Sequence, residues 1–179
     1  MIYTTRPESY RGLVHKLKEA YSWAVTNTNA DWIIKADDDT FVRVGSVAKL
    51  LERFSPTNPT VVGRIIRHAP VHKTGKWADV DYPHERYPPW AQGSCGHVVS
   101  RSVAQYVHEH KDSLPEYQGE DTTMGIWLHE SPIRSTVVWR DSGAFVNEGD
   151  CFNTSFVIVG HGIGSARMRQ CYQAQDEVM

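Results

Sequence analysis

A short apolar segment that runs into three consecutive carboxylates is the feature of this chain that most restricts its fold. Residues 31–36, Asp-Trp-Ile-Ile-Lys-Ala, have the pattern of a buried strand, and Asp37, Asp38 and Asp39 follow at once. Three like charges in one place destabilise a fold unless solvent or a cation neutralises them. The segment therefore predicts a strand whose carboxyl end opens onto solvent or a ligand.

Strands and helices are expected to alternate along the rest of the chain. Residues 10–27 place their apolar side chains on one helical face, and residues 44–54 form a second helix that ends at Ser55-Pro56. Four more strands and two more helices are expected after these, and residues 69–92 form a long loop that is rich in proline. The further strands are 60–67, 96–100, 134–139 and 156–159, and the further helices are 101–110 and 120–129.

This alternation predicts one α/β domain with a mostly parallel central sheet flanked by helices. The 179 residues are enough to bury roughly two-thirds of the surface of the unfolded chain, and no linker or repeat divides them. Ligands of such sheets bind at the carboxyl ends of the strands, which is where the three aspartates fall.

Composition excludes some classes of partner and leaves others open. The net charge of −2 gives no reason to expect nucleic acid or an anionic membrane surface, and no stretch has the length of a membrane span. Three cysteines permit one disulfide and one free thiol, in any pairing. Asn153-Thr154-Ser155 is a glycosylation sequon, of use only in a secretory lumen.

The acidic cluster favours a divalent cation. Carboxylate oxygens are hard ligands that suit Mn²⁺ or Mg²⁺, and such an ion neutralises a diphosphate. The alternative is a solvated acidic turn or helix cap. Two further features support the first interpretation: Glu120 and Asp121 open a helix, where Asp121 serves as a cap or as a general base, and His161 follows the last strand, where it is structural or completes a metal shell.

Other chemistries of acidic clusters fit less well. An aspartyl phosphatase needs Thr or Val four places after its first Asp, and counting from Asp37 puts Phe41 there and Thr40 one place early. The chain also contains no phosphate-binding GxxxxGK[ST] loop, no GxSxG elbow and no EF-hand spacing.

Four ordered blocks resemble the β-1,3-glycosyltransferases of glycosyltransferase family 31, which include the Fringe proteins. Residues 35–42, Lys-Ala-Asp-Asp-Asp-Thr-Phe-Val, match the family's K-x-D-D-D-x-F-V block. Residues 8–16 are similar to D-x-Y-x-N-L-T-x-K, with Gly12 and Val14 as departures. Residues 87–100 resemble Y-P-P-Y-C-S-G-x-G-Y-V-x-S with Ala91 in place of Cys, and residues 120–125 resemble E-D-V-x-x-G. A closing segment from Cys151 to His161 is similar to one in the family.

The resemblance implies a partial GT-A-like fold and a set of roles for matched positions. Asp37, Asp39 and His161 would hold Mn²⁺ (or Mg²⁺), Asp121 would be the catalytic base, and Asp38 would lie near the donor sugar. The other expected substrate-binding residues are Lys35, Trp90, Gly93 and Glu120, with Trp90 as a stacking wall or as part of a structural lid.

The resemblance also implies an activity and a location. It implies an inverting hexosyltransferase that moves Gal or GlcNAc from a UDP-sugar to a glycan acceptor on a glycoprotein or glycolipid, in β-1,3 linkage, within the lumen of the Golgi. Residues 1–179 would be one catalytic domain without the family's first strands, stem and membrane anchor. Two alternatives stay open: a sugar- or metal-binding module without turnover, which is an inactive fragment of such an enzyme, and a metal-dependent hydrolase.

Overall fold

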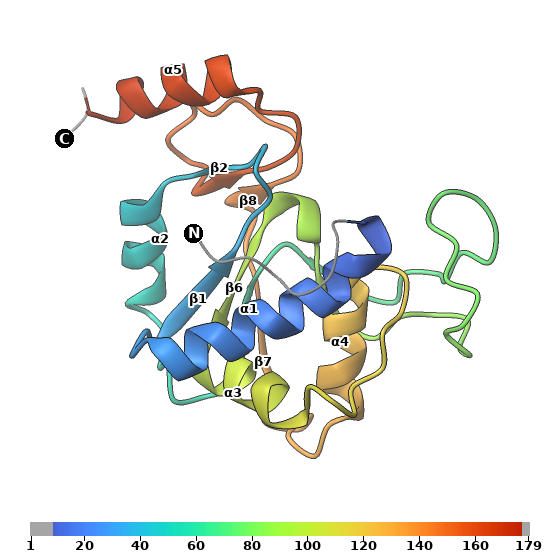
Figure 1. Cartoon of the computed structure of the whole chain (residues 1–179). Helices are drawn as coiled ribbons and strands as arrows, with labels where there is room; N and C mark the ends of the chain where they lie inside the picture. The colour runs from blue at the N-terminus through green and yellow to red at the C-terminus, as the bar shows by residue number, and fades with distance from the viewer. Residues whose placement is uncertain (1–8, 177–179) are drawn as a thin grey trace.

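The computed structural model describes residues 9–176, which form a mixed α/β fold (Figure 1). The helices are α1 (Leu13–Asn27), α2 (Val44–Leu51), α3 (Arg101–His110), α4 (Glu120–Glu130) and α5 (Ser165–Asp176), with 3-10 turns η1 (Tyr10–Gly12) and η2 (Gly93–Cys95). The strands are β1 (Trp32–Lys35), β2 (Phe41–Val42), β3 (Thr60–Gly63), β4 (Ile65–Ile66), β5 (Trp90–Ala91), β6 (His97–Ser100), β7 (Val138–Asp141), β8 (Phe145–Val146) and β9 (Ile158–Val159).

The central sheet is mixed, so the prediction of a mostly parallel sheet was wrong. Its strand order is β1-β6-β3-β7, and β6 runs antiparallel to both of its neighbours, while β3 and β7 are parallel. The expected parallel relation does hold between β1, β3 and β7, which all run in one direction. Strand β6 lies between β1 and β3 and runs in the opposite direction. This direction was not predicted, because hydrophobic patterning indicates that a segment is a strand but not which way it runs.

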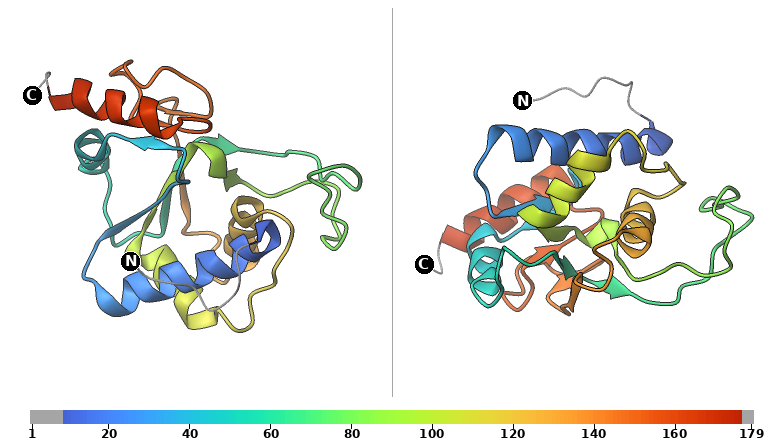
Figure 2. Two further views of the ribbon diagram at one scale, coloured as in Figure 1. Left: turned by 45° about the horizontal axis from the view of Figure 1, so that its top comes forward. Right: turned by 90° about the horizontal axis from the view of Figure 1, so that it is seen from below.

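Helices cover both faces of this sheet, as its alternating side chains require. Val61 and Val99 point toward α1, α3 and α4, whose apolar side chains form the larger core with them. Their neighbours Val62 and Val98 point to the other face, where they pack with α2 and with Phe145. Figures 1 and 2 show α1 and α3 side by side on the first face, with α2 on the other side of the sheet.

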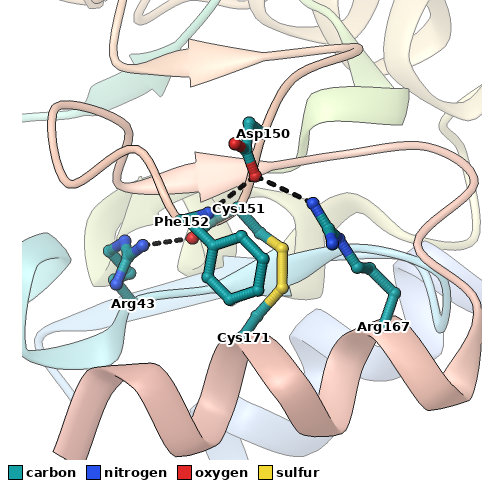
Figure 3. Close-up of a disulfide and its surroundings, with 6 residues drawn as sticks. All are labelled: Arg43, Asp150, Cys151, Phe152, Arg167 and Cys171. Atoms are coloured by element: carbon teal, nitrogen blue, oxygen red, sulfur yellow. Dashed lines mark hydrogen bonds and ion pairs between the residues drawn. A yellow bond between two sulfur atoms is a disulfide. The ribbon is translucent and has the colours of Figure 1, made fainter. Parts of the chain in front are cut away.

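A second, smaller sheet lies beyond the acidic turn and was not expected. Strand β2, which begins two residues after Asp39, pairs with β9, and β9 pairs in parallel with β8. Helix α5 packs on this sheet, and a buried disulfide between Cys151 and Cys171 joins it to the loop before β9 (Figure 3). Cys95 is the free thiol and is also buried.

Most of the elements predicted from periodicity are confirmed. The helices over 10–27, 101–110 and 120–129 are present, and the strand expected at 134–139 lies slightly later, in β7. The long loop extends away from the body of the molecule (Figures 1 and 2). Among the helices within residues 9–176, none has the length and apolar character needed to span a bilayer.

Candidate active site

The site forms at one edge of the central sheet because β1 and β6 are antiparallel. The end of β1 at Lys35 lies opposite the start of β6 at His97, so the aspartate turn lies beside the loop that precedes β6. Thr40 reaches this loop with its hydroxyl, which donates to the carbonyl of Ser94 at 3.5 Å. Residues separated by more than fifty positions in sequence thus share one edge.

Lys35 connects the strand, the turn and helix α4. Its ammonium donates to Asp37 Oδ1 at 2.7 Å, to Glu120 Oε1 at 2.8 Å and to the Gly93 carbonyl at 3.3 Å. Burial lowers the pKa of Lys35, but attraction to Glu120 and the hydrogen bonds to Asp37 and Glu120 outweigh it and leave the pKa above its ordinary value. The lysine therefore stays charged and holds two carboxylates in place.

Asp121 is held by two backbone N–H groups on the neighbouring loop and helix. Its Oδ2 accepts from Gly93 at 2.8 Å, and its Oδ1 accepts from Thr122 at 2.7 Å. Burial, and then the nearby charge of Glu120, raise the pKa of this carboxyl to about 6. A carboxylate oxygen has two acceptor positions, so each oxygen can still take a proton from a substrate hydroxyl.

Gly93 allows this close arrangement because it has no side chain. A Cβ at Gly93 would lie 2.6 Å from Glu120 Oε1, which is closer than such atoms approach, and 3.1 Å from Asp121 Oδ2, which is a tight contact. The glycine thus permits its own N–H to reach Asp121 and its carbonyl to reach Lys35.

Asp39 ties the acidic turn to the segment that contains His161. Its Oδ2 accepts from the backbone of Gly162 at 2.9 Å, and its carbonyl accepts from Ile163 at 3.0 Å. His161 is exposed and has a φ of 70°, a left-handed conformation that few side chains adopt. The structure thus brings Asp39 and the His161 loop together, while Asp38 is exposed to solvent.

The donor chemistry at this turn suits a hard divalent cation. Asp37 Oδ2 and Asp39 Oδ1 make no hydrogen bond within residues 9–176, and carboxylate oxygens are the ligands that Mn²⁺ and Mg²⁺ prefer. Across those residues no three His, Cys, Asp or Glu side chains already gather as a metal site. The residue types therefore fit such an ion, and binding it would require these side chains to move closer to one another.

Trp90 lies against helix α4. Its ring is partly buried with Tyr82, Tyr87 and Ile126, and its indole N–H is buried without a partner in the described part of the chain. Helix α4 approaches closely because Gly125 faces this strand: a Cβ there would lie 2.7 Å from the Cβ of Trp90. The structure thus places Trp90 as a packed ring beside the helix that carries Asp121.

Two exposed aromatic rings near the site were missed by sequence reasoning. Tyr10 and Trp77, from η1 and the long loop, lie 5.4 Å apart between ring centroids and are 47% and 50% exposed. Burial, followed by the charges of Glu120 and Asp121, raises the pKa of Tyr10 to about 12, which places this ring within the electrostatic reach of the site. The only sequence signal was the presence of aromatics in a long loop.

His97 is a second residue whose role was not foreseen. It is fully buried opposite Lys35, and its Nε2 lies 3.0 Å from the hydroxyl of Tyr21. Burial and the charge of Lys35 lower its pKa to about 3, so the ring is neutral and supports the strand from within the core.

Comparison with known proteins assigns this arrangement to a family. The sequence model of the galactosyltransferase family matches residues 1–137, which include the aspartate turn, Gly93 and the Glu120-Asp121 pair. The chain belongs to the galactosyltransferase family. A relative from Danio rerio, UDP-GalNAc:beta-1,3-N-acetylgalactosaminyltransferase 2, is 33% identical over 153 residues, covering 85% of this chain and 30% of the relative.

Plant members of the galactosyltransferase family are similar too. The hydroxyproline O-galactosyltransferase GALT2 of Arabidopsis thaliana is 32% identical over 143 residues, covering 74% of this chain and 21% of that protein. The human UDP-GalNAc:beta-1,3-N-acetylgalactosaminyltransferase 2 is 33% identical over 122 residues, which is 68% of this chain and 24% of the relative. This chain therefore spans a third or less of the length of these relatives.

Proposed function

We propose that this chain carries the catalytic centre of a metal-dependent, inverting hexosyltransferase of GT-A-like fold. It would move a sugar from a UDP-sugar to a glycan hydroxyl in β-1,3 linkage. The observation that carries the proposal is the Lys35 network, which joins the acidic turn to the helix that bears Asp121. The Danio rerio relative is named for UDP-GalNAc, which adds this sugar nucleotide to the donor candidates UDP-Gal and UDP-GlcNAc.

Asp121 is proposed as the general base. In an inverting transfer one carboxylate removes the proton of the acceptor hydroxyl while its oxygen attacks the anomeric carbon, so one base is sufficient. Two backbone N–H groups fix this carboxylate, and its pKa of about 6 gives it greater basicity than an ordinary aspartate while it remains ionised at neutral pH. Lys35, Glu120 and Gly93 then act as positioning residues for the base and the turn.

The acidic turn is proposed to hold the donor's diphosphate end. Asp37, Asp39 and His161 would hold Mn²⁺ or Mg²⁺, and such an ion neutralises negative charge on a diphosphate leaving group. The hydrogen bond from Gly162 to Asp39 supports this set, because it keeps the His161 loop against the turn. Asp38 is exposed beside it, where it could contact the donor.

The acceptor is proposed to approach from the side of the long loop. Tyr10 and Trp77 present exposed rings there, and aromatic faces bind the apolar faces of sugar rings. Trp90 would form the inner wall of this region, packed on α4. We propose that these residues lie in the lumen of the Golgi, as the family resemblance implies.

A transfer assay tests the proposal. The chain is incubated with Mn²⁺, one UDP-sugar and a panel of glycoside acceptors, and the product is examined by NMR for a β-1,3 linkage. Asp121→Asn is expected to reduce product formation by about 10²–10⁴-fold. Asp39→Ala is expected to lower the activity and to raise the Mn²⁺ concentration that is needed for it. Sugar released at the same rate without any acceptor would instead identify a hydrolase.

Thermal unfolding separates catalysis from binding. Mn²⁺ and UDP together, at about a hundred times their dissociation constants, are expected to stabilise the chain by about 2.7 kcal/mol, or about 5–10 °C, and Asp39→Ala to remove the effect. Stabilisation without transfer would identify a sugar- or metal-binding module. Neither stabilisation nor transfer in a folded chain would contradict the proposed donor site.

A further inference from the structure

One motif lies outside the candidate site. Asn153-Thr154-Ser155 is a complete glycosylation sequon, and it is the only one in the sequence. The nearest alternative, Asn58-Pro59-Thr60, has proline at the position where the reaction does not tolerate it. The chain therefore offers a single acceptor asparagine.

The sequon lies in an exposed turn between β8 and β9. Asn153, Thr154 and Ser155 are all exposed. The backbone of Asn153 donates to the Asp150 carbonyl at 3.0 Å, and its side-chain Oδ1 accepts from the backbone of Ser155 at 3.0 Å. Its Nδ2 makes no hydrogen bond within the described part of the chain, so the nitrogen that would carry a glycan is accessible.

A disulfide beside the sequon indicates the compartment in which this part of the chain folds. Cys151, two residues before Asn153, is bonded to Cys171, and both are fully buried (Figure 3). Disulfides form and persist in oxidising environments such as the lumen of the endoplasmic reticulum and the cell exterior. The same lumen contains the machinery that recognises this sequon.

We propose that Asn153 carries an N-linked glycan, added in the secretory lumen. In this step Nδ2 attacks the anomeric carbon of an oligosaccharide linked to a lipid diphosphate. The bond from that carbon to the diphosphate oxygen breaks, the C–N bond forms, the lipid diphosphate leaves, and Nδ2 loses one proton. The proposal is independent of whether the chain transfers sugars itself.

The fold can accept a glycan here without losing a core contact. The side chains next to the turn are at the surface: Phe152 is 39% exposed and lies 4.4 Å from the guanidinium of Arg167. Arg167 also pairs with Asp150 at 3.1 Å (Figure 3). These contacts are made by Asp150, Phe152 and Arg167, which lie outside the sequon, and Asn153 itself is exposed.

The test uses the whole chain, translated in a cell-free system with microsomes behind a cleavable leader. Only chains protected from added protease are scored, so every scored chain has entered the lumen. We expect a shift in mobility equal to one oligosaccharide, which a peptide N-glycosidase removes while converting Asn153 to aspartate. Asn153→Gln and Ser155→Ala are expected to abolish the shift. Ser155→Thr keeps a complete sequon and is expected to retain the shift.

A second variant provides a positive control for acceptor access. Pro59→Ala turns exposed Asn58 into part of a sequon, so Asn153→Gln with Pro59→Ala reports whether the machinery reaches the chain. Protected wild-type chains that stay unmodified while this control shifts would overturn the proposal. A shift that persists in Asn153→Gln alone would overturn it as well.

Discussion

Lys35 on β1 and Glu120 at the first position of α4 form an ion pair of 2.8 Å that joins the two halves of the candidate site. Both side chains are largely removed from solvent, at 16% and 9% exposure. The acidic turn therefore cannot move away from the proposed base without separating two buried charges.

Replacing Lys35 with methionine should destabilise the fold by about 3–5 kcal/mol, because it leaves Glu120 buried without its cation. Urea unfolding measures this change. Arg167→Met is the matched control: it removes a pair that is 48% and 59% exposed, and such pairs contribute about 0–1 kcal/mol. Equal losses in the two variants would show that the Lys35 pair is no more important than a surface pair.

Protonation of Asp121 should determine how the transfer activity falls at low pH. Its pKa is raised to about 6 by burial and Glu120, and a base acts only when it is deprotonated. Transfer should thus be full above about pH 7 and fall as the pH drops through about 6, measured as kcat/KM against pH. Asp121→Asn should lower kcat by about 10²–10⁴-fold. Activity maintained down to pH 4.5 would assign the base to a carboxylate with an ordinary pKa.

Much of the fold was predictable because its signals are local. The amphipathic pattern of 10–27 and the apolar strand before the aspartates both depend on neighbouring residues, and both elements are present. The antiparallel entry of β6 was not predictable, since it depends on pairing with β1 and β3, which lie far away in sequence. The small sheet was missed because two-residue strands such as β2 and β8 are too short to show a period.

The candidate site also combines features that local sequence predicted with contacts that it could not predict. Residue types and motif spacing indicated Asp121 and the aspartate turn. The sequence could not show that Lys35 donates to Asp37 and Glu120 at once, or that Tyr10 meets Trp77, since these contacts join segments that only the fold brings together. The pairing of Cys151 with Cys171 was equally undetermined, because three cysteines allow three pairings.

Gly93→Ala should reduce activity by at least about tenfold, a cost of about 1.4 kcal/mol in transition-state binding. The new Cβ would lie 2.6 Å from Glu120 Oε1, so either the Glu120 carboxylate or the backbone whose N–H holds Asp121 must shift. The control is Gly45→Ala, which meets no atom within 4 Å inside helix α2 and should stabilise the fold by about 0.5–1 kcal/mol without a change in kcat. Wild-type activity in Gly93→Ala would show that the close approach is not required.

Reduction of the Cys151–Cys171 bond should lower stability by about 3 kcal/mol, because the bond closes a loop of 20 residues in the unfolded chain. Differential scanning calorimetry with and without a reductant measures the loss. The double variant Cys151→Ser with Cys171→Ser should be insensitive to the reductant, whereas Cys95→Ala, at the free thiol, should respond as the wild type does. A reductant effect in the double variant would place the sensitivity elsewhere.

His161→Gly should separate metal binding from stability. His161 has a φ of 70°, which glycine adopts without strain, so the variant should match or exceed wild-type stability by up to about 1 kcal/mol. Its affinity for Mn²⁺ in the presence of UDP should nevertheless fall, because an imidazole ligand is lost. His68→Gly is the matched control, since His68 is exposed with a φ of 57° and should show the same effect on stability with unchanged Mn²⁺ affinity. Isothermal titration and thermal unfolding provide both readouts. Equal Mn²⁺ affinity in the two variants would remove His161 from the ligand set and leave the aspartates to hold the ion.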